Sequence, residues 1–299
     1  MKGLLVVVDL GGTNLRVAAL RGEEMIALKE MPSIAALPPE EGLGVLRGYI
    51  RDMAGGEAEG VVLGFPGVIT REGVLLHSPH LKSYEGVDLV GGLKELGIRV
   101  LVENDANLYT LGEGFRGAAK GRRHFCCLTL GTGVGGGVVI EGKLLKGARG
   151  VASELGHMVV DEDGMECYCG SRGCLEAYAS GSAILRMAQE KGFAVSSAKE
   201  VARLAFEGDD EAKGIFEEMG RYLGVGLANI VNIFNPEVIV IGGKVADAWP
   251  LFGPRALEEM KKRAFPYSAE GVQVTKALLG DEAALWGGVA LMKQRDADR

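Results

Sequence analysis

The chain has 299 residues, of which 47% are hydrophobic and 24% are charged, a balance typical of a folded globular protein. Intrinsic disorder is therefore excluded as its main character. The 40 acidic side chains outnumber the 33 basic ones and give a net charge of −7, which argues against nucleic acid as a partner, because phosphate backbones attract basic surfaces. The length suits one large domain or two medium ones.

Neither a membrane segment nor a secretion signal is expected. The longest apolar runs, such as Leu4 to Val8, are far shorter than the roughly 20 residues that a membrane helix needs. The N-terminal residues lack the basic, apolar and small-residue order of a signal peptide. The five cysteines are odd in number and three of them are close together, which favours metal binding in a reducing compartment over disulfides. We therefore expect a cytoplasmic protein without membrane association.

The first third of the chain alternates apolar runs with helical patterns. Apolar runs predict strands at 3–9, 15–20, 61–65 and 99–102. Helical spacing predicts helices at 40–53 and 106–116. The first two strands are joined by a short glycine turn, Leu10-Gly-Gly-Thr-Asn14, so we expect them to form an antiparallel hairpin.

The second part of the chain repeats this opening pattern. Further strands are predicted at 125–130, 137–140, 237–241 and 272–275, and helical regions at 180–234, 254–263 and 281–293. A second glycine-rich turn, residues 131–136, joins the first two of these strands. It follows the first turn by about 120 residues, which suggests two related halves.

Both glycine-rich turns are candidate phosphate sites. Glycine lets consecutive backbone N–H groups converge on one anion, as Asp9-Leu-Gly-Gly-Thr13 and residues 131–137 both allow. Each turn could instead serve only to reverse the chain, but the presence of two favours phosphate binding. Neither matches the P-loop or the dinucleotide fingerprint. The Asp9 carboxylate could hold Mg²⁺ beside the phosphates or brace the turn, and we favour the first role.

Three carboxylates are candidates for contact with a hydroxylated ligand. Asp105 lies between an apolar strand and a predicted helix, where α/β folds place ligand-binding groups. It could accept a hydroxyl proton, although the local sequence alone favours a helix N-cap. Glu154 and Glu176 could accept hydrogen bonds from ligand hydroxyls or could be surface carboxylates.

A metal site is indicated by the pattern His157-x9-Cys167-x-Cys169-x4-Cys174. One imidazole and three thiolates form a closed tetrahedral set for structural zinc. Cys126 and Cys127 lie in an apolar strand and are expected in the core. The other three histidines show no ligand spacing. We expect a structural role for His124 and leave the roles of His77 and His80 open.

Together these motifs resemble the ROK family of sugar kinases, and especially its bacterial ATP-dependent glucokinases, over nearly the whole chain. Residues 9–13 resemble the first phosphate motif, residues 131–137 the second, and Ile241-Gly-Gly243 the segment near adenosine. Residues 103–107 resemble the catalytic segment and residues 153–157 a sugar-contacting segment. Residues 167–176, Cys-Tyr-Cys-Gly-Ser-Arg-Gly-Cys-Leu-Glu, resemble the zinc signature, which is the most specific of these motifs.

The resemblance implies an α/β protein with the actin-like ATPase, or ribonuclease H-like, fold and an active-site cleft between two α/β domains. The N-terminal domain would span 1–117 and be joined by the C-terminal helix at about 281–299. The larger C-terminal domain would span 118–280 and carry the zinc loop. Relatives are commonly homodimers or homotetramers.

The resemblance also implies roles for single residues. Asp105 would be the general base for the 6-hydroxyl of a hexose. His157 would hold zinc through one ring nitrogen and donate to the sugar through the other. The implied sugar contacts are Gly67, Asn104, Asp105, Glu154, His157 and Glu176. The implied zinc ligands are His157, Cys167, Cys169 and Cys174. The implied contacts to ATP and Mg²⁺ are Asp9, Gly11, Gly12, Thr13, Gly131, Thr132, Gly133, Gly135, Gly136, Gly242 and Gly243.

The implied activity is ATP-dependent phosphorylation of a hexose, with glucose as the first expectation. Glucokinases of the family usually read Ser-Pro-Asn-Leu followed by Trp, where this chain has Ser78-Pro-His80-Leu81 and Tyr84. Mannose, fructose or an N-acetylhexosamine therefore remain alternatives, as do ADP or polyphosphate as donors.

Two non-catalytic alternatives come from the same resemblance. Sugar-responsive repressors of the family carry an N-terminal helix-turn-helix of about 60 to 80 residues, and a first phosphate motif at Asp9 leaves no room for one. A silent sugar-binding protein would not need Asp105 in addition to two glycine turns.

Overall fold

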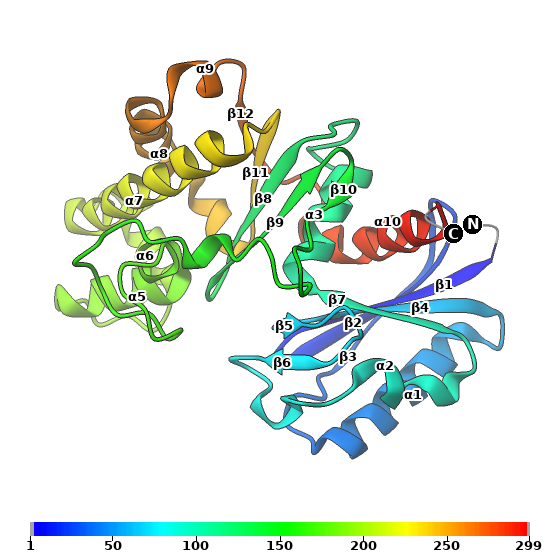
Figure 1. Ribbon diagram of the computed structural model, residues 1–299. Coiled ribbons are helices and arrows are strands. Elements are labelled where there is room, and N and C mark those ends of the chain that lie inside the picture. The colour runs from blue at the N-terminus through cyan, green and yellow to red at the C-terminus, as the bar shows by residue number, and fades with distance from the viewer. Residues whose placement is uncertain (1–2, 298–299) are drawn as a thin grey trace. The chain divides into compact units, whose positions relative to one another are not determined.

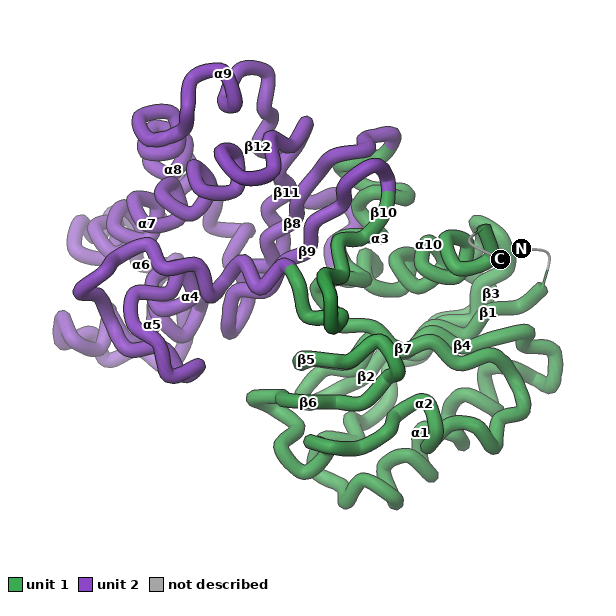
Figure 2. Tube along the Cα trace, in the orientation of Figure 1, with its two compact units in different colours: residues 1–120, 143–152, 281–299 green, residues 121–142, 153–280 purple. Residues whose placement is uncertain are grey.

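The computed structural model describes residues 3–297, and the fold consists of two compact units. The first contains the chain up to Lys120, residues 143–152 and the C-terminal residues from Asp281 onward. The second contains residues 121–142 and 153–280 (Figure 2). Within the described part of the chain, no helix combines the length and the hydropathy needed to cross a membrane.

The sheet of the first unit has the strand order β3-β2-β1-β4-β7 (Figure 1). Its strands are β1 (Leu4–Leu10), β2 (Asn14–Arg21), β3 (Glu24–Pro32), β4 (Ala58–Phe65) and β7 (Arg99–Asn104). The predicted hairpin is confirmed, since β1 and β2 pair antiparallel with Leu10 opposite Leu15. β4 and β7 run parallel to β1, so the carboxyl ends of these three strands lie at one edge of the sheet.

The strand β3 is missing from the sequence-based prediction. Most of its side chains are exposed, because it pairs only with β2 at the edge of the sheet. An edge strand buries little apolar surface, and its sequence therefore lacks the continuous apolar run by which the buried strands are recognised.

Helices complete the first unit. They are α1 (Pro39–Ala54), α2 (Leu89–Gly92), α3 (Asp105–Phe115) and α10 (Ala283–Ala297). The short elements are β5 (Val68–Ile69), β6 (Leu75–His77), β10 (Lys143–Leu144) and the 3₁₀ turns η1 (Lys82–Tyr84), η2 (Lys94–Leu96) and η5 (Gly280–Glu282). Apolar residues of β1, β2 and β4 form a fully buried core with α1. Residues 298 and 299 of the expected C-terminal helix lie outside the described residues.

The sheet of the second unit contains the consecutive strands β9-β8-β11-β12. These are β8 (Phe125–Leu130), β9 (Val134–Ile140), β11 (Val238–Gly242) and β12 (Gln273–Lys276). Cys126 and Cys127 are fully buried in β8, as expected. β9 begins three residues before the predicted strand, so Gly135 and Gly136 belong to the strand and not to the turn before it.

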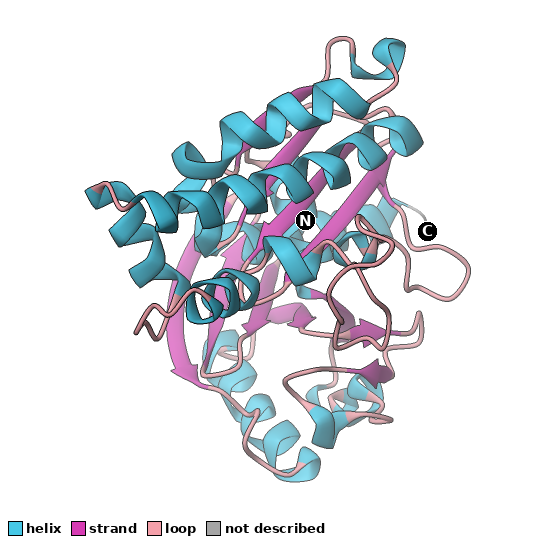
Figure 3. Cartoon of the chain, turned by 90° about the vertical axis from the view of Figure 1, so that its left-hand side faces the viewer, coloured by secondary structure: helices cyan, strands magenta, loops and turns pink. Residues whose placement is uncertain are grey.

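Helices of the second unit lie over its sheet (Figure 3). They are α4 (Glu176–Ala179), α5 (Gly181–Glu190), α6 (Ala198–Glu207), α7 (Asp210–Phe234), α8 (Trp249–Arg263) and α9 (Pro266–Ala269), with the 3₁₀ turns η3 (Leu155–His157) and η4 (Lys244–Ala248). The helical region predicted over 180–234 is divided into three helices, and Gly192 and Gly208 adopt positive φ at the two breaks. The helix predicted from residue 254 begins at Trp249, with Pro254 inside it.

Two glycines allow α3 and α10 to pack with their backbones in contact. A Cβ on Gly287 would lie 1.8 Å from the carbonyl oxygen of Leu108, and one on Gly112 would lie 1.9 Å from that of Ala283. These contacts are with rigid helix backbone, so a side chain at either position forces the helices apart.

Gly287→Ala should therefore destabilise the protein by about 1–3 kcal/mol, the usual cost of overpacking a core. Gly214→Ala in α7 is the matched control, because nothing lies within 4 Å of a Cβ at that position. The control should leave stability unchanged or raise it by up to about 1 kcal/mol, since alanine favours the helix. Urea unfolding monitored by circular dichroism measures both variants. Equal stability of the two would contradict the proposed contact.

Candidate active site

The first glycine turn is held in a tight conformation at the end of β1. The Gly11 N–H donates to the Asn14 carbonyl oxygen at 3.0 Å, and a Cβ on Gly11 would lie 2.6 Å from that oxygen. The Ser33 hydroxyl donates to the Gly11 carbonyl oxygen at 2.6 Å. Gly12 and Thr13 are exposed. The turn is thus fixed by its first glycine and open at the next two residues.

Asp9 lies directly before this turn in a site with little counter-charge. Its side chain is 22% exposed, and Arg16 Nη1 lies 3.8 Å from Oδ2. The same guanidinium forms a closer ion pair, 3.1 Å, with Asp281. Burial, with a smaller contribution from the charge of Asp105, raises the pKa of Asp9 from its ordinary value of 3.8 to about 7. A bound cation would stabilise the ionised form.

Asp105 is the first residue of α3. The residue before it, Asn104, is the N-cap, and its Oδ1 accepts a hydrogen bond from the Asn107 N–H at 3.0 Å. The local sequence favours Asp105 as the N-cap, and this prediction is wrong by one residue. Asp105 Oδ1 accepts from the Ala106 N–H at 2.9 Å.

The environment of Asp105 shifts the pKa of its carboxyl group upward. Burial is the largest cause, while the Ala106 N–H and the charge of His80 act in the opposite direction. His80, whose role the sequence left open, is thus an electrostatic neighbour of the candidate base. No spacing rule could have found it, because the two residues lie 25 positions apart, His80 in a loop and Asp105 at the start of α3.

The edge formed by β1, β4 and β7 brings the predicted residues of the first unit together. Asn104 Nδ2 donates to the Gly67 carbonyl oxygen at 3.1 Å, which joins the end of β7 to the loop that follows β4. Asp9 at the end of β1 interacts electrostatically with Asp105. Ligand sites in α/β folds commonly lie at the carboxyl ends of parallel strands.

In the second unit, the turn between β8 and β9 lies against two other segments. The Gly131 carbonyl oxygen accepts from the Gly181 N–H at 2.7 Å, at the start of α5. Gly243 adopts a φ of +82°, and a Cβ there would lie 2.3 Å from the Leu130 carbonyl oxygen. The predicted segments 131–133 and 242–243 are therefore adjacent, with Thr132 exposed and Gly242 buried at the end of β11.

Glu176 connects this turn to the cysteine loop. Its Oε2 accepts from the Val134 N–H at 2.8 Å, and a Cβ on Gly133 would lie 2.4 Å from the same oxygen. Its Oε1 lies 4.0 Å from Cys167 Sγ. Gly136 is likewise closely packed, since a Cβ there would lie 2.8 Å from the Cys127 carbonyl oxygen. These glycines thus have structural reasons to lack a side chain, in addition to any role with phosphate.

The four predicted metal ligands come together. One ligand atom from each of His157, Cys167, Cys169 and Cys174 lies within 4.8 Å of the others. The Sγ atoms of Cys169 and Cys174 are 3.7 Å apart, as are Cys167 Sγ and His157 Nδ1. Tetrahedral zinc with Zn–S bonds of about 2.3 Å requires separations of about 3.8 Å between sulfur ligands, so the residues present fit this ion.

His157 presents its two ring nitrogens to different partners. Nδ1 faces Cys167, whereas Nε2 lies 3.4 Å from the hydroxyl oxygen of Tyr168. Tyr168 is 59% exposed and is a neighbour that sequence analysis missed. Glu154, three residues before His157, is exposed.

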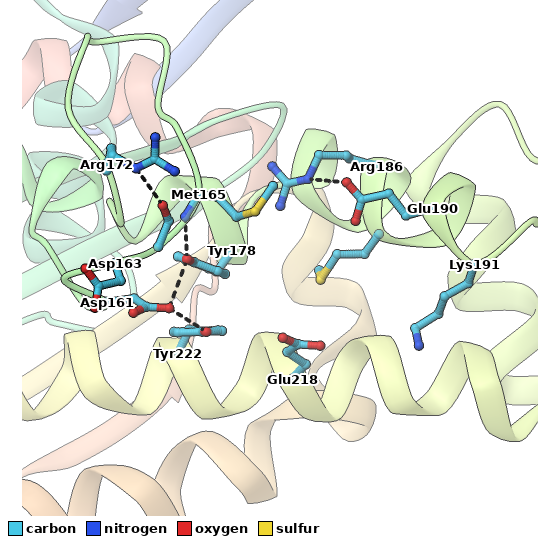
Figure 4. A pocket seen from close by; sticks show the side chains of 12 residues that line it. Asp161, Asp163, Met165, Arg172, Tyr178, Arg186, Glu190, Lys191, Glu218 and Tyr222 are labelled. Carbon is cyan, nitrogen blue, oxygen red and sulfur yellow. Dashed lines mark hydrogen bonds and ion pairs between the residues drawn. The ribbon is translucent and has the colours of Figure 1, made fainter.

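The loop that carries the cysteines is anchored by two stacked tyrosines. Asp161 Oδ2 accepts from the hydroxyls of Tyr178 at 3.1 Å and Tyr222 at 2.9 Å, and the two rings stack at 3.7 Å (Figure 4). Tyr178 Oη also accepts from the Met165 N–H. These residues line a cavity of about 520 Å³ between the loop, α5 and α7. The anchor joins the loop to α4 and α7.

Comparisons with known proteins give one consistent family. A model described as the ROK family matches residues 5–295. A glucokinase of Thermotoga maritima is 36% identical, covering 97% of this chain and 98% of its own. The structure of a ROK hexokinase from Thermus thermophilus aligns with a TM-score of 0.86 and 32% identity, covering 98% of this chain and 99% of its own. A ROK family glucokinase from Streptomyces griseus, solved with glucose and AMPPNP, aligns with a TM-score of 0.82 and 31% identity, covering 98% and 100%.

Repressors also match, over a shorter region. A xylose repressor of Bacillus spizizenii is 32% identical over 229 residues, which are 76% of this chain and 59% of the repressor. The solved ROK kinases establish that the two units have the actin-like ATPase fold of the sugar kinases, which confirms the predicted fold class.

The raised pKa of Asp9 predicts a pH-dependent effect of Asp9→Asn. Between about pH 4 and pH 7 the unfolded chain has already lost a proton that the folded Asp9 retains, so this group lowers stability as the pH rises. Asparagine removes the effect. The variant should therefore gain stability relative to wild type between pH 5 and pH 8, by about 3 kcal/mol, because the folded Asp9 retains its proton over about two pH units of this range and one unit corresponds to about 1.4 kcal/mol.

Urea unfolding without added divalent cations at both pH values measures this gain. Asp52→Asn, at an exposed position on α1, is the control and should shift stability equally at both pH values. A pH-independent effect of Asp9→Asn would contradict the assigned environment.

Proposed function

We propose that this chain, which belongs to the ROK family, transfers the γ-phosphoryl group of ATP to the 6-hydroxyl of a hexose, with glucose as the preferred substrate. The observation that carries the proposal is the position of Asp105, a partly buried carboxylate at the start of α3 on the strand edge that also presents Asp9. Similarity over nearly the full length to glucokinases, one of them solved with glucose and AMPPNP, supports the same reaction.

In the proposed reaction Asp105 accepts the proton of the 6-hydroxyl as that oxygen attacks phosphorus. Burial raises the pKa of Asp105, which makes the carboxylate a stronger base than an exposed aspartate. Its hydrogen bond from the Ala106 N–H fixes the orientation of the carboxylate. Phosphoryl transfer depends mainly on positioning and charge stabilisation, so the base acts by orienting the hydroxyl and by late proton acceptance.

The other hydroxyls of the hexose are proposed to bind to Gly67, Asn104, Glu154, His157 and Glu176. Asn104 and Gly67 already bond one another, so their relative position is fixed before a sugar binds. One oxygen of Glu176 is engaged by the Val134 N–H, which leaves Oε1 as the atom for a hydroxyl or for orienting a metal ligand.

ATP is assigned to the two glycine turns, which would hold its phosphates, and to the 242–243 segment, which would lie near the adenosine. These residues are Gly11, Gly12, Thr13, Gly131, Thr132, Gly133, Gly135, Gly136, Gly242 and Gly243. Mg²⁺ would neutralise charge on the phosphate oxygens. Asp9 fits it because, among the described residues, this partly buried carboxylate is paired only with Arg16, at 3.8 Å.

Zinc is assigned to His157, Cys167, Cys169 and Cys174, whose ligand atoms fit a tetrahedral ion. With four protein ligands the site has no open position, so its role is structural. By fixing the Nδ1 side of His157, the ion would orient the ring and hold the loop near Glu176.

Phosphoryl transfer from Mg-ATP to glucose, mannose, fructose and N-acetylglucosamine tests the proposal. We expect turnover, fastest with glucose. Asp105→Asn keeps an acceptor for the Ala106 N–H but removes the base, so kcat should fall by about 10²–10⁴ while the Kd for glucose stays within about threefold. Coupled spectrophotometry and calorimetry measure the two quantities.

Asp88→Asn is the matched control, because Asp88 caps α2 by accepting from the Gly91 N–H at 2.8 Å and lies outside the proposed site. It should keep wild-type kcat. Tight hexose binding by a wild-type protein that phosphorylates none of the sugars would instead indicate a sugar sensor.

Zinc content provides a separate prediction. The purified protein should contain about one zinc per chain by plasma mass spectrometry, and Cys169→Ala should lose it, because removing one thiolate opens a four-ligand site. Cys169 is exposed, so this variant leaves no cavity in the core. Cys126→Ala, at a cysteine outside the cluster, should retain zinc. Equal zinc in both variants would refute the ligand set.

A further inference from the structure

We propose that Lys146 positions the segment Asn104–Asp105 through an ion pair with the buried Glu103. The inference rests on the proposed function, since it concerns how the candidate base is held. Lys146 touches neither Asp105 nor any group assigned to substrate in the described contacts, so it is a positioning residue and not a catalytic one.

Glu103 is the centre of this arrangement. It is 3% exposed and lies next to the last residue of β7. Its Oε1 accepts from the Asn104 N–H at 3.1 Å and from Asn107 Nδ2 at 3.0 Å. One carboxylate oxygen therefore holds both the backbone that precedes Asp105 and a side chain in the first turn of α3.

Lys146 supplies the counter-charge for this carboxylate. Its Nζ lies 2.6 Å from Glu103 Oε2, and the two groups form an ion pair. The lysine side chain is itself only 19% exposed. Burying a carboxylate this deeply is costly without an adjacent cation, so the orientation of Glu103 depends on Lys146.

Two other side chains affect the charge around Asp105. Asp9 adds negative charge, and the side chain of His80 acts in the opposite direction. Without Lys146, the buried Glu103 carboxylate would lose its adjacent cation and would turn toward water. This change weakens the acceptor at Oε1 and releases Asn104 and Asn107, which together set the direction of Asp105.

The segment that carries Lys146 has a second, independent anchor. Residues 143–152 group with the first unit, although the chain on both sides of them belongs to the second. Arg71 Nη2 donates to the Gly147 carbonyl oxygen, and Gly150, with a φ of +90°, packs against the Arg71 backbone. Arg71 therefore holds the same segment without contacting Glu103, and it offers a matched control.

Lys146→Met should lower kcat by about tenfold to a hundredfold, with KM for ATP within about threefold of wild type, because misplacement of a catalytic group affects the chemical step. The double variant Lys146→Met/Glu103→Gln removes both charges and keeps an oxygen acceptor at residue 103. Its kcat should return to within about threefold of wild type. Arg71→Met should change kcat by less than about threefold.

Amide hydrogen exchange of residues 103–107 gives a readout that does not depend on activity. Exchange should accelerate about tenfold in Lys146→Met, stay at the wild-type rate in Arg71→Met, and recover in the double variant. The inference would be overturned if Lys146→Met changed neither the exchange rate nor kcat. It would also be overturned if kcat of the double variant were as low as that of Lys146→Met. A wild-type protein without kinase activity would refute the proposed function, while the exchange data would still decide the role of Lys146.

Discussion

The burial of carboxylates at one sheet edge is the constraint on which the candidate site depends. Asp9 lies at the carboxyl end of β1, Glu103 at the carboxyl end of β7, and Asp105 in the first turn of α3. Burial of a carboxylate is unfavourable, and each of the three has a different group that offsets it. Glu103 has an adjacent lysine, Asp105 has a helix N–H, and Asp9 has an arginine at the longer distance of 3.8 Å. One neighbourhood thus contains a carboxylate paired with a lysine, the proposed base held by a helix N–H, and a carboxylate proposed to bind a cation.

At these turns, close packing and the proposed phosphate binding both favour glycine. Gly11, Gly133 and Gly243 each lie where a Cβ would strike backbone or a buried carboxylate. Gly12 has open space and is exposed, so packing does not explain it. A glycine motif therefore predicts the turn reliably, while the contacts around each glycine decide whether phosphate binding is needed to account for it.

Sequence patterns predicted the features that depend on residues close together in the chain. The first hairpin, the buried strands of both sheets and the clustering of His157, Cys167, Cys169 and Cys174 follow from local spacing and are confirmed. What the sequence did not predict depends on distant contacts. Lys146 meets Glu103 across 43 positions, and Glu176 meets Val134 across 42. The edge strand β3 was missed because it buries too little apolar surface, and Asn104 rather than Asp105 is the cap because the helix begins one residue earlier than expected.

The two departures from the glucokinase pattern differ in what they can do to substrate choice. Tyr84 is fully buried, and its hydroxyl donates to the Ile34 carbonyl oxygen at 3.0 Å. Gly42 makes room for that hydroxyl, since a Cβ there would lie 1.8 Å from it. The change at residue 84 is thus absorbed in the core by α1. His80 is exposed, and its charge acts on Asp105. A difference in hexose preference from related glucokinases should therefore originate at residue 80 and not at residue 84.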